Sequence, residues 1–268
     1  MRRQDTLTEA PPRGRCRAVL ESLADPAATH SLVTIHGIAD APEVWQPVCR
    51  ALGSRFARTW QLELRWHMGV GEPYDYPDCG SVLREGWLQL PPGRKVVLAH
   101  SFGCNALMRM VQATPLADVD ALVLLSPYYK PAYTAFDWPL FERYVSEFRR
   151  FLETSIDARS QGRVIAPDLR REILGRLLQS YSPPSWVMFY REWSRTPALD
   201  LLPLSMPCIV MTGSEDFSLP VEDPEVLATR LARADFAVLE GLGHFALIED
   251  PAITAGHIAS FLAERLDT

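Results

Sequence analysis

The chain has 268 residues, of which 47% are hydrophobic and 22% are charged. Its formal net charge of −6 comes from 33 acidic and 27 basic residues, and no basic run gathers the cations that a phosphate-binding surface needs, so we expect no nucleic-acid partner. No run approaches the roughly 18 consecutive apolar residues of a membrane span, so we expect no membrane partner either.

The N-terminal residues 1–14 include arginines with no apolar stretch behind them, which predicts a flexible polar tail rather than a secretion signal. The five cysteines are widely spaced and form no C-x-x-C pair. Reduced thiols in a cytoplasmic protein are the simplest interpretation. The histidines show no metal-ligand spacing, so we expect no metal site and no cofactor.

Apolar runs rich in β-branched residues alternate with helical patterns along most of the chain. This alternation predicts an α/β fold with a mostly parallel, doubly wound sheet. The expected helices between the earlier strands lie near residues 43–53, 80–90 and 103–114. The expected strands lie near residues 15–22, 31–36, 58–65, 95–100, 119–126, 207–212 and 235–240.

The last helix has a clear start, because Asp250 can cap it and Pro251 suits its first turn. Its apolar residues then recur on one face, which predicts that this helix covers the sheet. They are Ile258, Phe261, Leu262 and Leu266.

The alternation stops after residue 127, where helical patterns replace strands. We therefore expect a core of residues 15–127 and 200–268, with a helical lid at residues 128–199 inserted between the two segments. The lid is rich in aromatic residues at helical spacing, a pattern consistent with packing on the core or with an apolar roof over a pocket. The aromatic stripes include Phe148, Phe151, Phe189 and Trp193. The residues expected to contact a substrate are Tyr129, Trp138, Phe141, Trp186 and Tyr190.

The strand near residue 95 runs into a helix with almost no loop, in the segment KVVLAHSFGCNALM. Such a junction forces a sharp turn, and Ser101 stands at its tip. Ala99 and Gly103 flank it, and larger side chains there would collide with the neighbouring strand or helix. The pattern is that of the nucleophile elbow G-x-S-x-G, with alanine in place of the first glycine.

A serine hydroxyl is a weak nucleophile until a base takes its proton, and the base needs an acid that fixes its tautomer. Two later strands are followed by the loops GSEDF and GLGHF, which supply Asp216 and His244. We therefore expect Ser101, Asp216 and His244 to form a catalytic triad. Glu215 is the nearest competitor for the role of the acid. Ser126, at the end of the preceding strand, is not a carboxylate and cannot take this role, which favours Asp216.

The anionic intermediate of acyl transfer needs preorganised N–H donors. The amide of Phe102, at the start of the helix after the elbow, is one candidate. The amide of Ile38, in the loop HGI after the second strand, is the other. Asp40 follows this loop, and two roles are open for it: contact with a substrate hydroxyl or amine, or capping of the helix near residues 41–45.

The HGI loop, the elbow, Asp216 and His244, in this order, resemble the serine-nucleophile branch of the α/β-hydrolase fold superfamily, over nearly the whole chain from about residue 15. The resemblance implies an α/β-hydrolase type of sheet with a helical cap inserted after the sixth core strand. It also implies that His36 braces its loop and that His100 is structural.

A serine at the elbow sets aside the epoxide hydrolase and haloalkane dehalogenase branches, which use aspartate there. We expect a serine hydrolase of the carboxylesterase or thioesterase kind, which cleaves an ester, thioester or lactone of an apolar acyl substrate through an acyl-enzyme. Two alternatives stay open: an elimination, lyase or acyl-transfer enzyme of small-molecule or natural-product metabolism, and a ligand-binding protein on a hydrolase scaffold. The oligomeric state is open as well, with a homodimer among the options.

Overall fold

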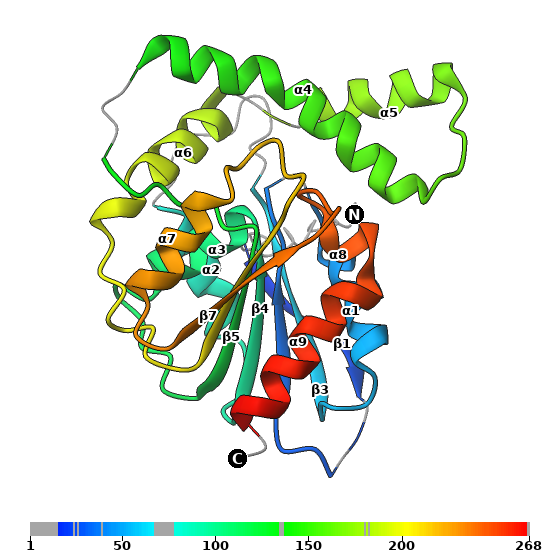
Figure 1. Ribbon diagram of the computed structural model, residues 1–268. Coiled ribbons are helices and arrows are strands. Elements are labelled where there is room, and N and C mark those ends of the chain that lie inside the picture. Colours follow the sequence, from blue (N-terminus) through cyan, green and yellow to red (C-terminus); the bar gives the residue numbers. More distant parts are fainter. Residues whose placement is uncertain are drawn as a thin grey trace, which may run out of the picture.

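The computed structural model describes residues 16–266 apart from 24, 26, 39, 67–77, 134–136, 180 and 182, so the expected tail at residues 1–14 lies outside the described residues. The strands of the described chain form one seven-stranded sheet in the order β1-β3-β2-β4-β5-β6-β7 (Figure 1). They are β1 (Cys16–Leu23), β2 (Ser31–Ile35), β3 (Arg58–Leu64), β4 (Lys95–His100), β5 (Val119–Leu125), β6 (Cys208–Gly213) and β7 (Ala234–Leu239).

The sheet is mostly parallel, as predicted. Only the pairing of β1 with β3 is antiparallel among the strand pairs of the described chain. The central strands β4 and β6 are buried along their whole length, because helices cover both faces of the sheet. This burial explains why they are nearly continuous apolar runs rather than alternating ones. All seven predicted strands are confirmed to within one residue at either end.

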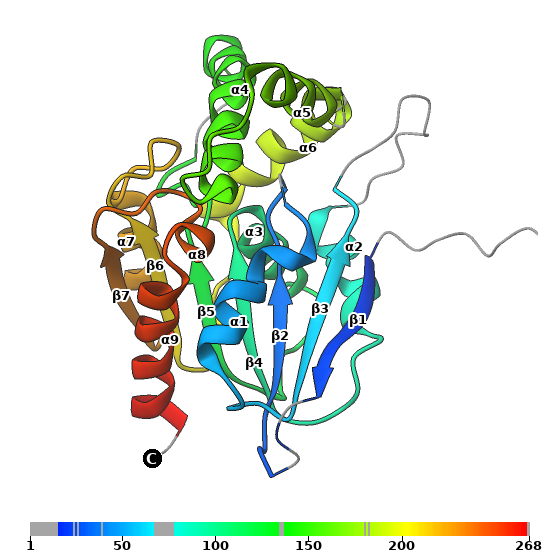
Figure 2. The ribbon, with the colours of Figure 1, turned by 90° about the vertical axis from the view of Figure 1, so that its right-hand side faces the viewer.

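The helices cover the two faces in the predicted doubly wound manner (Figure 2). Helices α1 (Gln46–Leu52) and α9 (Pro251–Leu266) pack together on one face, and α2 (Cys79–Trp87) and α3 (Phe102–Met110) pack together on the other. Helix α7 (Glu222–Arg230) packs against β6 and β7. The short helices outside the insertion are η1 (Pro42–Trp45) and α8 (Ala246–Glu249).

The start of α9 is confirmed. The carboxylate oxygen Oδ1 of Asp250 accepts hydrogen bonds from the amides of Ala252 at 3.1 Å and Ile253 at 2.9 Å, which satisfies two of the free N–H groups at the helix end. The predicted apolar face of this helix packs into the core, where Ile258, Phe261 and Leu262 are buried. None of the described helices has the length and apolar character needed to cross a membrane.

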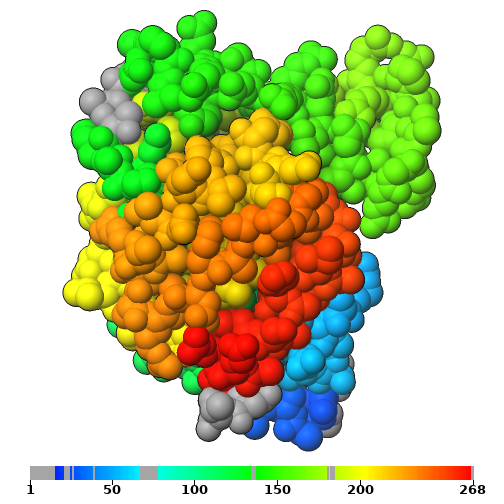
Figure 3. All heavy atoms as spheres, viewed as in Figure 1, coloured from blue at the N-terminus to red at the C-terminus, as the bar shows by residue number. Residues whose placement is uncertain are grey.

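The insertion consists of α4 (Trp138–Ser160), α5 (Pro167–Gln179), α6 (Pro183–Ser194) and η2 (Thr196–Ala198), and we call α4, α5 and α6 the cap. It follows β5, the fifth strand of the described chain, where the resemblance implied a place after the sixth core strand. The cap lies over the carboxyl ends of the parallel strands (Figure 1). In the space-filling view, α4 and α5 extend beyond the side of the core (Figure 3).

Buried charge fixes α6 to the core. The side chain of Glu192, on α6, is only 3% exposed, and its carboxylate pairs with Arg109 of α3 at 3.2 Å and with Arg191 at 2.7 Å. A buried carboxylate without a partner would cost several kcal/mol, on the order of 3–5, so these ion pairs hold α6 above the helix that follows the elbow.

Candidate active site

The turn between β4 and α3 is strained as the elbow pattern predicts. Ser101 has φ 55° and ψ −127°, in a region that residues other than glycine rarely occupy. Its amide donates to the carbonyl of Leu125 on the neighbouring strand at 2.9 Å. A Cβ atom on Gly103 would lie 2.7 Å from the carbonyl oxygen of His36, which explains why the residue two positions after the serine has no side chain.

Ser101, His244 and Asp216 meet at the carboxyl edge of the sheet, although they come from three loops far apart in the sequence. His244 Nε2 lies 2.8 Å from Ser101 Oγ, and His244 Nδ1 lies 2.7 Å from Asp216 Oδ2. All three residues are buried, with at most 8% of their surface exposed. In this geometry the imidazole can take the serine proton on Nε2 while its Nδ1–H donates to the carboxylate of Asp216, which fixes the tautomer.

The carboxylate of Asp216 has a further partner that the sequence did not reveal. Ser218 donates to Asp216 Oδ1 through its hydroxyl at 2.6 Å and through its amide at 3.0 Å. Burial alone would raise the pKa of Asp216, but His244 and these two bonds hold that pKa below its ordinary value. Asp216 is therefore an anion beside the imidazole at neutral pH.

Neither of the other two positions considered for the acid forms a hydrogen bond with His244 in the described part of the chain. Glu215 is exposed, and its amide donates to the carbonyl of Leu242 at 2.9 Å. Ser126 also has a positive φ, 49°, and its buried hydroxyl forms no hydrogen bond within the described part of the chain. Asp216 is the carboxylate that the structure places against His244.

His36 braces the loop after β2, as the resemblance implies. Its Nε2 accepts a hydrogen bond from the amide of Leu64 at 3.1 Å, so the ring proton sits on Nδ1, which donates to the carbonyl of Gly37 at 2.8 Å. Burial lowers the pKa of His36, which favours this neutral tautomer. The loop thereby packs closely against Ser101, because a Cβ on Gly37 would lie 2.9 Å from the Cβ of Ser101.

The two residues predicted to supply oxyanion amides flank this contact. Ile38 follows Gly37 and is 5% exposed, and Phe102 follows Ser101 as the first residue of α3 and is fully buried. Both therefore belong to backbone segments that touch Ser101.

A cavity of about 40 Å³ lies beside the triad, under the cap. Its walls are mostly aromatic, and two of the rings also pack on the imidazole of His244, with centroid distances of 4.9 Å for Phe151 and 5.3 Å for Tyr128. The lining residues are Ile38, Tyr128, Tyr144, Glu147, Phe148, Phe151, Trp186, Phe189, Phe217 and Ser218. A space of this size holds only a few water molecules. The cavity is therefore narrow.

Of the five aromatic residues predicted to contact a substrate, only Trp186 lines this cavity. Trp138, Phe141 and Tyr190 line a separate hollow of about 300 Å³ elsewhere on the cap. Tyr129 is fully buried, and its hydroxyl accepts a hydrogen bond from Arg230. The structure does not bring these four residues to the triad. Helical spacing identifies residues that share a face, but it does not say which face turns toward the core.

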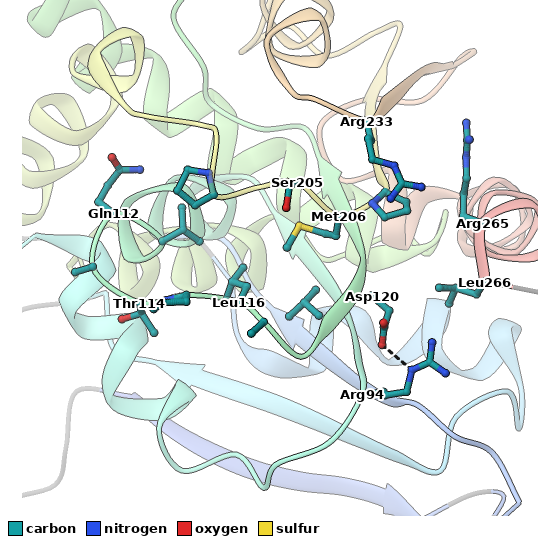
Figure 4. A pocket seen from close by; sticks show the side chains of 17 residues that line it. Arg94, Gln112, Thr114, Leu116, Asp120, Ser205, Met206, Arg233, Arg265 and Leu266 are labelled. Atoms are coloured by element: carbon teal, nitrogen blue, oxygen red, sulfur yellow. Dashed lines mark hydrogen bonds and ion pairs between the residues drawn. The ribbon is translucent and has the colours of Figure 1, made fainter.

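A wider hollow, of about 900 Å³, lies at the opposite edge of the sheet (Figure 4). It is bordered by residues next to the amino ends of β4, β5 and β6, such as Arg94, Asp120 and Met206. Arg94 is paired there with Asp120 at 3.0 Å. The triad lies at the carboxyl edge, where open parallel sheets bind their ligands, so this hollow is not part of the same site. The described residues hold no group of three or more metal-binding side chains.

Comparison with known proteins agrees with this fold. The sequence matches the Alpha/beta hydrolase family over residues 32–257. No curated protein matches the sequence.

Solved structures of the same fold resemble the chain over most of its length. A bacterial membrane phospholipase A shares 19% identity, with a TM-score of 0.69 over 94% of this chain and 84% of that one. A carboxylesterase study of the thaumarchaeon Nitrososphaera gargenis gives 20% identity and a TM-score of 0.66 over 96% and 97% of the two chains. The carboxylesterase CesB from Bacillus subtilis gives 17% identity and a TM-score of 0.61 over 93% and 92%.

Proposed function

We propose, since the chain belongs to the α/β hydrolase family, that it is a serine hydrolase that cleaves an ester, thioester or lactone of an apolar acyl substrate through an acyl-enzyme. The observation that carries this proposal is the continuous chain of short contacts from Ser101 through His244 to Asp216, at 2.8 and 2.7 Å. A serine activated in this way attacks acyl carbons. The esterases among the similar structures support the same reaction class.

In the proposed reaction, Ser101 Oγ forms a bond to the acyl carbon while its proton moves to His244 Nε2. The amides of Ile38 and Phe102 donate to the oxygen that becomes negative. His244 then passes the proton to the leaving oxygen or sulfur as the old bond breaks. Water attacks the acyl-enzyme, again giving its proton to His244, and the free acid leaves as the proton returns to Ser101.

The aromatic cavity supports an apolar acyl group as the part of the substrate that lies under the cap. A ring of Phe, Tyr and Trp side chains offers a large apolar contact area and few polar groups for a sugar or a peptide backbone. The space of about 40 Å³ is smaller than a medium acyl chain, so we propose that the cap moves when substrate enters.

Labelling with a fluorophosphonate tests the assignment. We expect wild-type protein to be labelled once per chain, and Ser101→Ala to lose both the label and the turnover of 4-nitrophenyl esters. Ser205→Ala, at an exposed serine of the hollow in Figure 4, serves as the control and stays labelled. Label that survives Ser101→Ala would refute the nucleophile.

Turnover in heavy-oxygen water separates hydrolysis from the alternatives. Hydrolysis places one heavy oxygen in the released acid, whereas elimination or transfer of the acyl group to another acceptor does not. Labelling without any turnover on an ester panel of increasing acyl length would instead favour a ligand-binding protein.

A further inference from the structure

Asp40 is a buried carboxylate that the triad does not use. Its side chain is 1% exposed, yet both of its oxygens are occupied. Oδ2 lies 3.1 Å from His100 Nδ1, and Oδ1 accepts a hydrogen bond from Arg159 on the cap. Asp40 does not cap the next helix, since η1 begins after Ala41 with no side-chain cap. The two roles left open by the sequence therefore give way to a third, in which Asp40 links the core to the cap.

The hydrogen-bond partners of His100 assign its protonation state. Its Nδ1 faces the carboxylate of Asp40, and its Nε2 lies 2.9 Å from the carbonyl oxygen of His244, the proposed base. Both partners only accept hydrogen bonds, so both ring nitrogens must donate, and a ring that donates twice is an imidazolium. Among the described residues, the rings of Trp45, Phe245 and His244 also pack on this imidazole, and the His244 ring, with a centroid distance of 5.1 Å, is the titratable one of the three.

Asp40 is correspondingly an anion. Burial would raise the pKa of its carboxyl, but the hydrogen bond and charge of His100, together with the charge of Arg159, hold that pKa below its ordinary value. Both partners of this ion pair are buried, since the side chain of His100 is 0% exposed and that of Asp40 is 1% exposed. Two buried charges this close strengthen each other's hydrogen bonds, and removing either would strand the other.

The same loop receives a second cap residue. The hydroxyl of Tyr181, which follows α5, donates to the carbonyl oxygen of Ile38 at 2.8 Å. Asp40 is also close to Gly37, because a Cβ on Gly37 would lie 3.3 Å from Asp40 Oδ2 and 3.3 Å from Ser101 Oγ. The carboxylate and the nucleophile thus flank one glycine, and the loop between them is held from above by the cap.

We propose that Asp40 and His100 are positioning residues that fix the backbone of the base His244, and that Arg159 completes this arrangement only when the cap is closed. The side chain of Arg159 is 42% exposed, so it can leave into water when the cap opens, whereas Asp40 and His100 stay buried. Closure of the cap over a substrate then sets the oxyanion loop and the base together. This inference rests on the proposed hydrolase function.

The protonation state can be tested without catalysis. Nitrogen-15 NMR of the full-length protein, with the histidine signals assigned by substitution, is expected to show His100 with two protonated ring nitrogens at neutral pH. In Asp40→Asn, the same ring is expected to show one protonated nitrogen. A neutral His100 ring in the wild type would overturn the proposal.

Substitutions at Arg159 test the link to the cap. Because one charge-assisted hydrogen bond is lost, we expect Arg159→Gln to lower the rate of fluorophosphonate labelling and the kcat for 4-nitrophenyl butyrate about tenfold, with little change in KM. Arg159→Lys, which keeps the charge, is expected to recover most of the rate. The control is Arg149→Gln, which breaks an exposed pair with Glu153 on the same helix and is expected to match the wild type.

The outcomes separate the two proposals. A labelling rate in Arg159→Gln that equals or exceeds that of Arg149→Gln overturns the positioning role and leaves the hydrolase proposal standing. A wild type that takes no label overturns the proposed function, and this inference with it.

Discussion

A few residues around Ser101 would carry the proposed chemistry, and each is held in place by contacts with its neighbours. The serine is strained at φ 55°, the histidine is fixed by two contacts on its ring, and Gly37 leaves room for the loop to touch the serine. Strain of this kind persists only where the surrounding structure imposes it. The site is therefore preorganised, and small additions to it are expected to be costly.

Gly37→Ala tests this close packing. The added Cβ would lie 2.9 Å from the Cβ of Ser101 and must displace either the loop or the nucleophile. We expect about a hundredfold loss of kcat/KM, because small misplacements of reacting groups have effects of that order, together with a loss of about 1–3 kcal/mol in the free energy of unfolding. Steady-state kinetics and urea unfolding measure both.

The matched control is Gly175→Ala in α5. A Cβ at this position meets nothing within 4 Å. Alanine is the better helix former, so we expect a gain of up to about 1 kcal/mol in stability and unchanged kinetics. Equal effects at the two glycines would contradict the contact between the loop and the nucleophile.

At this scale the sequence predicted the triad but not its supports. Ser101, Asp216 and His244 each follow a recognisable strand, and the carboxyl ends of parallel strands share one edge, so their meeting could be foreseen. Serine is common in loops, and nothing in the sequence marked Ser218 as a partner of Asp216. The contact between Asp40 and His100 depends on β2 lying beside β4, which the order of the elements along the chain does not state.

The cap contributes walls to the cavity beside Ser101, His244 and Asp216. Helices α4 and α6 supply aromatic side chains to the cavity beside the triad, and Trp186 packs against Phe148 with a centroid distance of 4.1 Å. Such edge-to-face contacts add to the apolar area that the rings bury. The cavity is small because these rings occupy most of the space under the cap. Truncating one of them is therefore expected to enlarge the cavity.

Trp186→Ala is expected to favour longer acyl chains. Removing the indole enlarges the cavity under the cap, so more of a long acyl chain can be buried. Each buried methylene group contributes about 0.8 kcal/mol, and about two more of them would raise the ratio of kcat/KM for an octanoate ester to that for an acetate ester about tenfold. Val187→Ala, at the next residue, is the control, because Val187 is exposed and lines the other hollow of the cap. An unchanged ratio in Trp186→Ala would show that the acyl group lies elsewhere.

The helical character of the insertion could be predicted, but the orientation of its helices could not. Residues such as Phe148 and Phe189 belong to the predicted aromatic stripes and do line the cavity, whereas Phe141, from the same stripe as Phe148, lines the other hollow of the cap. The face that turns inward depends on tertiary contacts, such as the pair of Glu192 with Arg109, which joins residues 83 positions apart.

The whole molecule couples its stability to the ionisation of buried carboxylates. Asp216 and Asp40 both have a pKa below the ordinary value, because each is paired with a buried histidine that outweighs the cost of burial. A carboxyl whose folded pKa is depressed stabilises the folded state fully above its unfolded pKa of about 3.9, and this contribution is lost as the pH falls toward the folded pKa.

We therefore expect the free energy of unfolding to fall as the pH drops below about 6.5, where the unfolded chain protonates His36 while burial lowers the pKa of this residue in the folded state, and to fall further below about 4, where the two carboxylates are protonated. Urea unfolding followed by circular dichroism at a series of pH values measures this dependence. Asp216→Asn is expected to be less stable at pH 7 but to lose less stability on acidification, because it has one coupled carboxyl fewer. A variant as steep as the wild type would show that the carboxylate of Asp216 is not coupled to folding.

The most direct test of the proposed mechanism is to find the acyl group on the protein. A slowly turned-over ester is mixed with the wild type, the reaction is quenched in acid within the first turnover, and the digested chain is analysed by mass spectrometry. We predict a single acyl adduct on the peptide that contains Ser101, and none in Ser101→Ala. An adduct on another residue, or steady turnover with no adduct on Ser101, would contradict the mechanism.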